Sequence, residues 1–131
     1  VNKPDHKDAI DVIAKVGGLD IAGMVGCYLG AAICQMPILI DGFISAVSAY
    51  LACMLNQTAK EYMIPTHCSA EPAAKMIMEK LGMEAPLHAG MHLGEGTGAI
   101  MGLSLINQAL NVYYHVATFE GGHVEAYTHQ V

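Results

Sequence analysis

Stretches of apolar residues separated by short polar breaks divide the sequence into predicted helices and strands. Apolar positions between 43 and 54 recur at the spacing of one helix face and predict a helix over residues 43–55. The short apolar runs at residues 37–40 and 62–65 have the length of strands and favour a buried, parallel arrangement. The other predicted helices cover residues 21–34, residues 69–80 with Ser69 as N-cap, and residues 99–116.

The order of these elements, strand–helix–strand–helix, is that of a βαβ unit. It predicts an α/β fold in which a parallel sheet carries helices on its faces. Ligands bind such sheets beyond the carboxyl ends of the strands. Asp41 directly follows the first predicted strand, and His67 and Ser69 follow the second, so we expect chemistry at these positions.

The composition indicates that part of the apolar surface is covered by something outside this chain. Of the 131 residues, 53% are hydrophobic and 14% are charged, although a small folded chain needs polar surface to cover its core. So apolar a sequence excludes intrinsic disorder. Six basic and twelve acidic residues give a net charge of −6 without a basic patch, which argues against nucleic-acid binding.

Three stretches, residues 21–40, 42–59 and 96–119, lack charged side chains and are long enough to raise the question of membrane spans. Glycine, proline, asparagine or glutamine interrupts each of them, and their ends lack the basic clusters and aromatic belts of membrane helices. Buried elements of an α/β core explain them better, so we expect no membrane contact. The four cysteines form no C-x-x-C pair and are expected to be reduced, mostly buried thiols of a cytoplasmic protein.

The sharpest local motif is Leu-Gly-Glu-Gly-Thr-Gly at residues 93–98. Glycines around one carboxylate, just before an apolar helix, let the backbone approach a ligand and leave amide donors free. We therefore expect Glu95, between Gly94 and Gly96, to face a ligand. Burial must offset the helix dipole if such a carboxylate is to act as a base near neutral pH. The alternative is an acid that only stabilises the start of the helix.

Three further polar residues are candidates for ligand binding, each with a structural alternative. Asp41 could accept hydrogen bonds from ribose hydroxyls, or it could cap the helix that follows it. Ser69 and nearby amides could hold a phosphate or carboxylate group. Alternatively, Ser69 and Glu71 could simply cap the next helix.

Two common ligand-binding patterns are incomplete or absent. His88 and His92 stand four residues apart, but Gly90 lies between them and no third ligand is near, so we expect no metal site. The sequence has neither a P-loop nor a G-x-G-x-x-G motif after a strand, so independent nucleotide binding has little support. We accordingly expect no cofactor.

Five sequence blocks carry a family resemblance. They are residues 16–24 (VGGLDIAGM), 37–45 (PILIDGFIS), 67–72 (HCSAEP), 91–98 (MHLGEGTG) and 117–119 (ATF). In order and approximate spacing the blocks resemble the C-terminal part of nicotinate-nucleotide:dimethylbenzimidazole phosphoribosyltransferase. The resemblance assigns residues 1–131 to the C-terminal part of one phosphoribosyltransferase domain.

The resemblance implies a Rossmann-like parallel sheet with flanking helices, in a cytoplasmic homodimer. It implies an enzyme of cobamide lower-ligand assembly that moves 5-phosphoribosyl from nicotinate mononucleotide to 5,6-dimethylbenzimidazole or a similar base, giving α-ribazole phosphate. By similarity, Glu95 is the catalytic base, which takes a proton from the benzimidazole as its other nitrogen attacks the ribose. The substrate-binding residues that it implies are Asp41, Ser69, Glu71, Gly94 and Gly96.

The chain differs from the family's pattern in extent and at individual positions. It lacks the upstream loop that cradles the phosphate and the N-terminal segments of the benzimidazole pocket. We therefore expect a missing N-terminal part or a partner chain to complete the enzyme; the alternative is a non-catalytic binding or accessory module of the same fold. His92 stands where an arginine is common, and Ala73 and Ala74 stand where a Gly-His pair often follows Ser-Ala-Glu-Pro.

Overall fold

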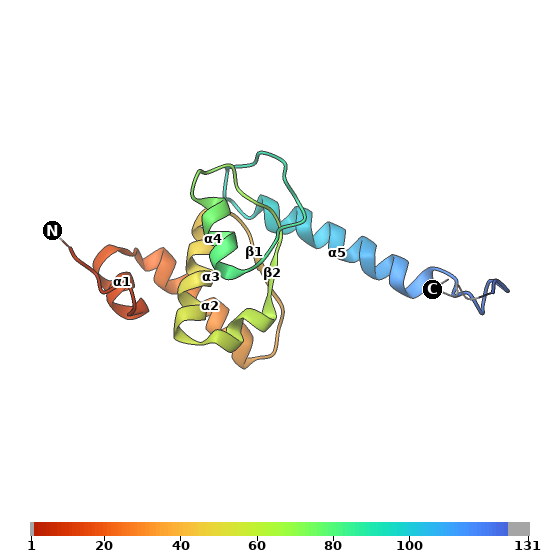
Figure 1. Cartoon of the computed structure of the whole chain (residues 1–131), viewed down its shortest axis with the longest axis horizontal. Helices are drawn as coiled ribbons and strands as arrows, with labels where there is room; N and C mark the ends of the chain where they lie inside the picture. Colours follow the sequence, from red (N-terminus) through yellow and green to blue (C-terminus); the bar gives the residue numbers. More distant parts are fainter. Residues whose placement is uncertain (1, 126–131) are drawn as a thin grey trace, which may run out of the picture.

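A computed structural model describes residues 2–125, in which helices pack around a short sheet and the last helix projects away from them (Figure 1). In chain order the elements are α1 (Ala9–Val16), α2 (Leu19–Ile33), β1 (Ile38–Ile40), α3 (Phe43–Leu55), a 3₁₀ helix (Gln57–Tyr62), β2 (Met63–Pro65), α4 (Ala74–Leu81) and α5 (Thr97–His115). The strand–helix–strand–helix order predicted from the sequence is present.

β1 and β2 form a two-stranded parallel sheet, and α3 makes the crossover between them. Ile38 pairs with Met63, and Ile40 pairs with Pro65. Just past β2, the amide of Thr66 donates to the Ile40 carbonyl at 3.2 Å, and its hydroxyl donates to the same oxygen at 2.6 Å. The predicted α/β class is confirmed, and both strands end at the same edge of the sheet.

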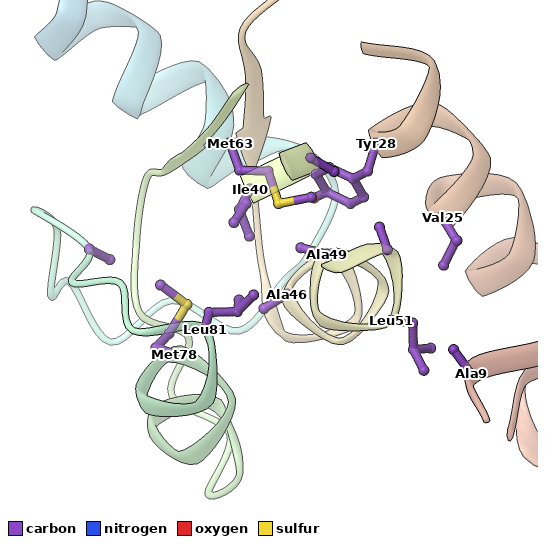
Figure 2. Close-up of a cluster of buried hydrophobic side chains, with 13 residues drawn as sticks. Ala9, Val25, Tyr28, Ile40, Ala46, Ala49, Leu51, Met63, Met78 and Leu81 are labelled. Atoms are coloured by element: carbon purple, nitrogen blue, oxygen red, sulfur yellow. The ribbon is translucent and has the colours of Figure 1, made fainter. Parts of the chain in front are cut away.

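α3 lies at the centre of the core, where small side chains let its neighbours approach closely. Ala49 and Ala52 of α3 are completely buried. Tyr28 of α2 and Leu81 of α4 approach α3 from different directions, and Ile40 reaches the same cluster from β1 (Figure 2). The core therefore holds α2, α3, α4 and the strand ends in one arrangement.

The helix boundaries match the sequence pattern at α3 and differ at α4. The prediction of residues 43–55 for α3 is confirmed, whereas α4 starts at Ala74 and not after Ser69. The N-cap of α4 is Ala73, without a side-chain hydrogen bond. Ser69 instead donates to Glu71 and to the Met91 carbonyl, so the capping interpretation of Ser69 is wrong.

α2 carries two cysteines on a side that the core does not cover. Its buried residues are Val25, Tyr28 and Ala31, which are spaced as one helix face. Cys27 lies off this face and is exposed, as is Cys34 at the end of the helix. Cys53 and Cys68 are only partly buried, so the expectation of mostly buried thiols is wrong.

α5 has little support from the rest of residues 2–125. Within it only Gly98 and Gly102, near its start, are buried, and the remainder extends away from the other elements (Figure 1). The composition predicts that part of the apolar surface is covered by something outside this chain, and α5 carries part of that surface. The exposed large apolar side chains of α5 are Ile100, Met101, Leu103, Leu105, Leu110, Val112, Tyr113 and Tyr114. No helix among the described residues has the length and apolar character needed to cross a membrane.

Candidate active site

A cavity of about 660 Å³ lies at the edge where both strands end, and all six predicted site residues line it. The turn after β1 and the segment after β2 supply two of its walls, and the loop that precedes α5 supplies a third. The six residues are Asp41, Ser69, Glu71, Gly94, Glu95 and Gly96. The structure thus brings together residues from three separated blocks of the sequence, at the place where parallel sheets bind ligands.

The Asp41 carboxylate holds the start of α5. One oxygen, Oδ2, accepts from the Gly96 amide at 3.0 Å, and the other, Oδ1, accepts from the Ala99 amide at 2.9 Å. Asp41 therefore caps α5 from the end of β1 and satisfies two of its unpaired amides. The alternative that Asp41 caps the helix following it is wrong, because the N-cap of α3 is Gly42 and no side chain caps that helix.

Asp41 is itself anchored to the core. Its backbone amide donates to the Ser45 hydroxyl at 3.1 Å, and that hydroxyl lies 2.6 Å from the hydroxyl of Tyr28. Tyr28 is almost completely buried, and this burial raises the pKa of Tyr28 to about 12. A continuous chain of hydrogen bonds therefore leads from α2, through the first turn of α3, to the start of α5.

Glu95 lies between two glycines whose backbones are left-handed. Gly94 has φ +72° and Gly96 has φ +78°, which glycine adopts at little cost and other residues adopt with strain. A Cβ at either position would meet no atom within 4 Å outside the two neighbouring residues. The backbone conformation of the turn, and not a lack of space, therefore favours glycine at both positions.

The structure leaves Glu95 exposed and occupies part of the amide donors around it. Its side chain is exposed at the cavity wall, so residues 2–125 do not supply the burial that a base near neutral pH requires. The amide donors expected to be free at the helix start are in part occupied, because Asp41 holds those of Gly96 and Ala99. Any burial of this carboxylate has to come from a bound ligand or from another part of the protein.

Ser69 and Glu71 form another part of the cavity wall. The buried Ser69 hydroxyl donates to the Glu71 carboxylate and to the Met91 carbonyl at 3.3 Å. The Ala70 amide donates to the same carbonyl at 3.0 Å. These contacts tie the segment after β2 to the segment that leads to Glu95.

Comparison with known proteins places the chain in a family. The sequence model of a family described as Phosphoribosyltransferase matches residues 1–124. The chain belongs to this phosphoribosyltransferase family. It is 49% identical over 131 residues to the nicotinate-nucleotide–dimethylbenzimidazole phosphoribosyltransferase of Acetivibrio thermocellus, covering 100% of this chain and 37% of the relative. The enzyme of the same name from Clostridium acetobutylicum is 50% identical over 127 residues, which cover 97% of this chain and 36% of the relative.

Solved structures of the phosphoribosyltransferase family share the fold. A crystal structure of the nicotinate-nucleotide–dimethylbenzimidazole phosphoribosyltransferase of Thermus thermophilus superposes with a TM-score of 0.84 at 32% identity. The match covers 91% of this chain and 36% of that one. The chain therefore spans little more than a third of the length of the relatives that it matches.

Residues that the sequence did not single out also line the cavity. Asp20 and Met24 of α2 line it, together with Phe43 at the start of α3. The signal was available, because these residues lie in the blocks at 16–24 and 37–45 that carry the resemblance. No group of three or more possible metal ligands occurs within residues 2–125.

Proposed function

We propose that the protein containing this segment transfers 5-phosphoribosyl from nicotinate mononucleotide to 5,6-dimethylbenzimidazole or a similar base. The products are α-ribazole phosphate, for the cobamide lower ligand, and nicotinate. The observation that carries the proposal is the position of Glu95, on the wall of the cavity that also gathers Asp41, Ser69 and Glu71. Relatives that bear the name of this reaction match nearly the whole chain.

In the proposed reaction Glu95 is the general base. One benzimidazole nitrogen attacks the anomeric carbon of the ribose, the bond from that carbon to the nicotinate nitrogen breaks, and nicotinate leaves. The second benzimidazole nitrogen loses its proton to Glu95, so no charge accumulates on the product ring. Attack from the face opposite nicotinate inverts the anomeric centre, and holding the two rings on either side of the ribose supplies much of the acceleration.

The neighbouring residues position this base and receive the substrate. The Asp41 carboxylate fixes the turn that carries Glu95 by two hydrogen bonds and also lines the cavity. Each of its oxygens has a further lone pair that could accept a hydrogen bond from a ribose hydroxyl. In this proposal Ser69 lies near the nicotinate or phosphate group, and Glu71 is a further substrate-binding residue. Gly94 and Gly96 leave room for a flat ring beside the base. Binding of that ring would provide the burial that Glu95 lacks in residues 2–125.

The active enzyme in this proposal includes a further part of the polypeptide or a partner chain. The exposed apolar side chains of α5 support this, because a helix with such a surface is stable only when another element covers it. Either the segments that this chain lacks relative to its relatives, or a second copy in a homodimer, would cover α5. The proposed enzyme is cytoplasmic and uses no cofactor.

A chimeric enzyme provides the test. The matching segment of the A. thermocellus relative is replaced by this chain, which is 49% identical to it, and Glu95 is changed to Gln. We expect turnover to fall by about 10²–10⁴-fold, the usual contribution of a general base, with nicotinate mononucleotide still bound. Glu61→Gln is the matched control, because Glu61 is an exposed acid outside this cavity.

The outcomes separate the proposed base from its alternative. Wild-type turnover in Glu95→Gln would remove Glu95 from the mechanism. A chimera that binds nicotinate mononucleotide and dimethylbenzimidazole by calorimetry, but makes no product, would favour the non-catalytic binding module.

A further inference from the structure

His67 is a buried histidine that the proposed mechanism does not use. It lies two residues beyond β2, and only 4% of it is exposed. Its ring nitrogen Nδ1 is buried and has no hydrogen-bond partner among the described residues. An unpaired buried polar atom costs about 1–3 kcal/mol. Among residues 2–125 no hydrogen bond at this nitrogen holds the ring, whereas the ring has close packing contacts.

The His67 ring packs directly against the first turn of α5. A Cβ added to Gly98 would overlap the ring at Nδ1, so the nitrogen lies against the Gly98 backbone. One turn later, a Cβ at Gly102 would overlap the side chain of Thr66. Gly98 and Gly102 are four residues apart and thus share one helix face. The segment just past β2 is therefore the surface on which α5 begins.

The His67 ring also lies close to the turn after β1, which contains Gly42. A Cβ at Gly42 would lie 3.9 Å from Cε1 of His67 and 3.6 Å from the α carbon of Gly94. The ring thus fills the space between the turn after β1 and the first turn of α5. The backbone around His67 is fixed as well, because the Cys68 amide donates to the Leu87 carbonyl at 2.9 Å.

Two contacts therefore locate the turn that carries Glu95. The Asp41 carboxylate draws the start of α5 toward the end of β1 by two hydrogen bonds. The ring of His67 limits how closely that start can approach the sheet, through Gly98. The hydrogen bonds from the residue after β1 and the steric contact with the residue after β2 together fix the position of this turn relative to the sheet.

We propose that His67 is a positioning residue that sets the location of Glu95 through its contact with Gly98. The effect on turnover rests on the proposed function of Glu95, whereas the packing role does not. His67 itself touches no reacting atom in this proposal. A displacement of the base by about 1 Å is enough to lower turnover by roughly 10²-fold.

A double-mutant cycle in the chimeric enzyme tests the contact. Gly98→Ala adds a methyl group that overlaps the ring, and His67→Ala removes the ring. We expect each single variant to lower kcat by about 10²-fold with a smaller change in KM for nicotinate mononucleotide. In the His67→Ala background, Gly98→Ala should cost at least about 10-fold less than in the wild type. Equal costs of Gly98→Ala in the two backgrounds would overturn the proposal.

Hydrogen exchange in the peptide containing Gly96 and Ala99 gives a readout that does not need catalysis. His67→Ala should accelerate exchange of these two amides, which Asp41 holds. Leu81→Ala is the control for general loss of stability, since Leu81 is buried in α4; it should leave this peptide protected. His88→Ala is the control for an exposed histidine. Unchanged exchange in His67→Ala would overturn the positioning role even if turnover fell.

The two proposals fail in different ways. If Glu95→Gln kept full turnover while His67→Ala still accelerated exchange, the base assignment would fall and the positioning role would stand. If Glu95→Gln lost turnover while His67→Ala changed neither exchange nor kcat, the positioning role would fall alone. Should His67→Ala prevent folding, His67→Leu fills more of the space and takes its place in the cycle.

Discussion

At the scale of single residues, Tyr28 connects the core with the cavity. Its hydroxyl is hydrogen-bonded to the Ser45 hydroxyl, which in turn accepts a hydrogen bond from the backbone amide of Asp41. Neither link was predictable, because a tyrosine in an apolar helix gives no sign of its partner. The candidate Glu95 was predictable, because glycine is the residue that tolerates the left-handed backbone found at Gly94 and Gly96.

Tyr28 makes the stability of the chain depend on pH in the alkaline range. Burial raises the pKa of Tyr28 to about 12, above the value near 10 of an unfolded tyrosine. Its stabilising contribution is therefore complete below pH 10 and is lost as the pH rises toward 12, by roughly 2 kcal/mol. Urea unfolding at pH 9 and pH 11.5 should show a smaller loss for Tyr28→Phe than for the wild type. An identical loss of stability in the wild type and in Tyr28→Phe would contradict the raised pKa of Tyr28.

At the scale of elements, the predictions succeeded where local periodicity decides and failed where distant contacts decide. α3 has the predicted bounds because its apolar spacing is regular. The predicted start of α4 at Ser69 was wrong, because the Ser69 hydroxyl donates to the Met91 carbonyl, 22 residues away, and does not cap the helix. The capping of α5 by Asp41 joins residues 55 and 58 positions apart, and no local pattern carries that information.

The Asp41 cap should contribute measurably to α5. Replacing Asp41 by Ala leaves the amides of Gly96 and Ala99 without their acceptor, at a cost of about 1 kcal/mol. Asp20→Ala is the matched control, because Asp20 lines the same cavity but does not cap α2. Denaturant unfolding and hydrogen exchange at these amides would measure the difference. Equal stability of the two variants would show that the two hydrogen bonds do not matter.

At the scale of the whole molecule, exposed apolar surface is concentrated on α5. This agrees with a composition that is half hydrophobic, and with the 37% of the A. thermocellus relative that the chain covers. Composition predicted the excess of apolar surface but not its location. The location depends on α5 touching the sheet only through its first two turns.

If another element covers α5 in the complete enzyme, a charged side chain introduced on α5 should lower the stability of the complete enzyme but not that of this chain alone. Leu103 is 47% exposed in residues 2–125, so Leu103→Glu should change the stability of this chain by less than about 0.5 kcal/mol. In the chimera the same change should destabilise the protein or dissociate it, by more than about 2 kcal/mol. Gln108→Glu is the control on the same helix. Light scattering combined with thermal unfolding distinguishes dissociation from unfolding. If Leu103→Glu had no effect in the chimera, α5 would not be covered by another element.

The distance between the Glu95 carboxylate and the acceptor base tests the proposed role of Glu95 as the general base. A crystal structure of the chimera with nicotinate mononucleotide and a slow benzimidazole analogue would measure it. We expect about 2.6–3.2 Å from a carboxylate oxygen to the benzimidazole nitrogen that loses the proton. A carboxylate that points into solvent, with neither that nitrogen nor a single bridging water in reach, would contradict it.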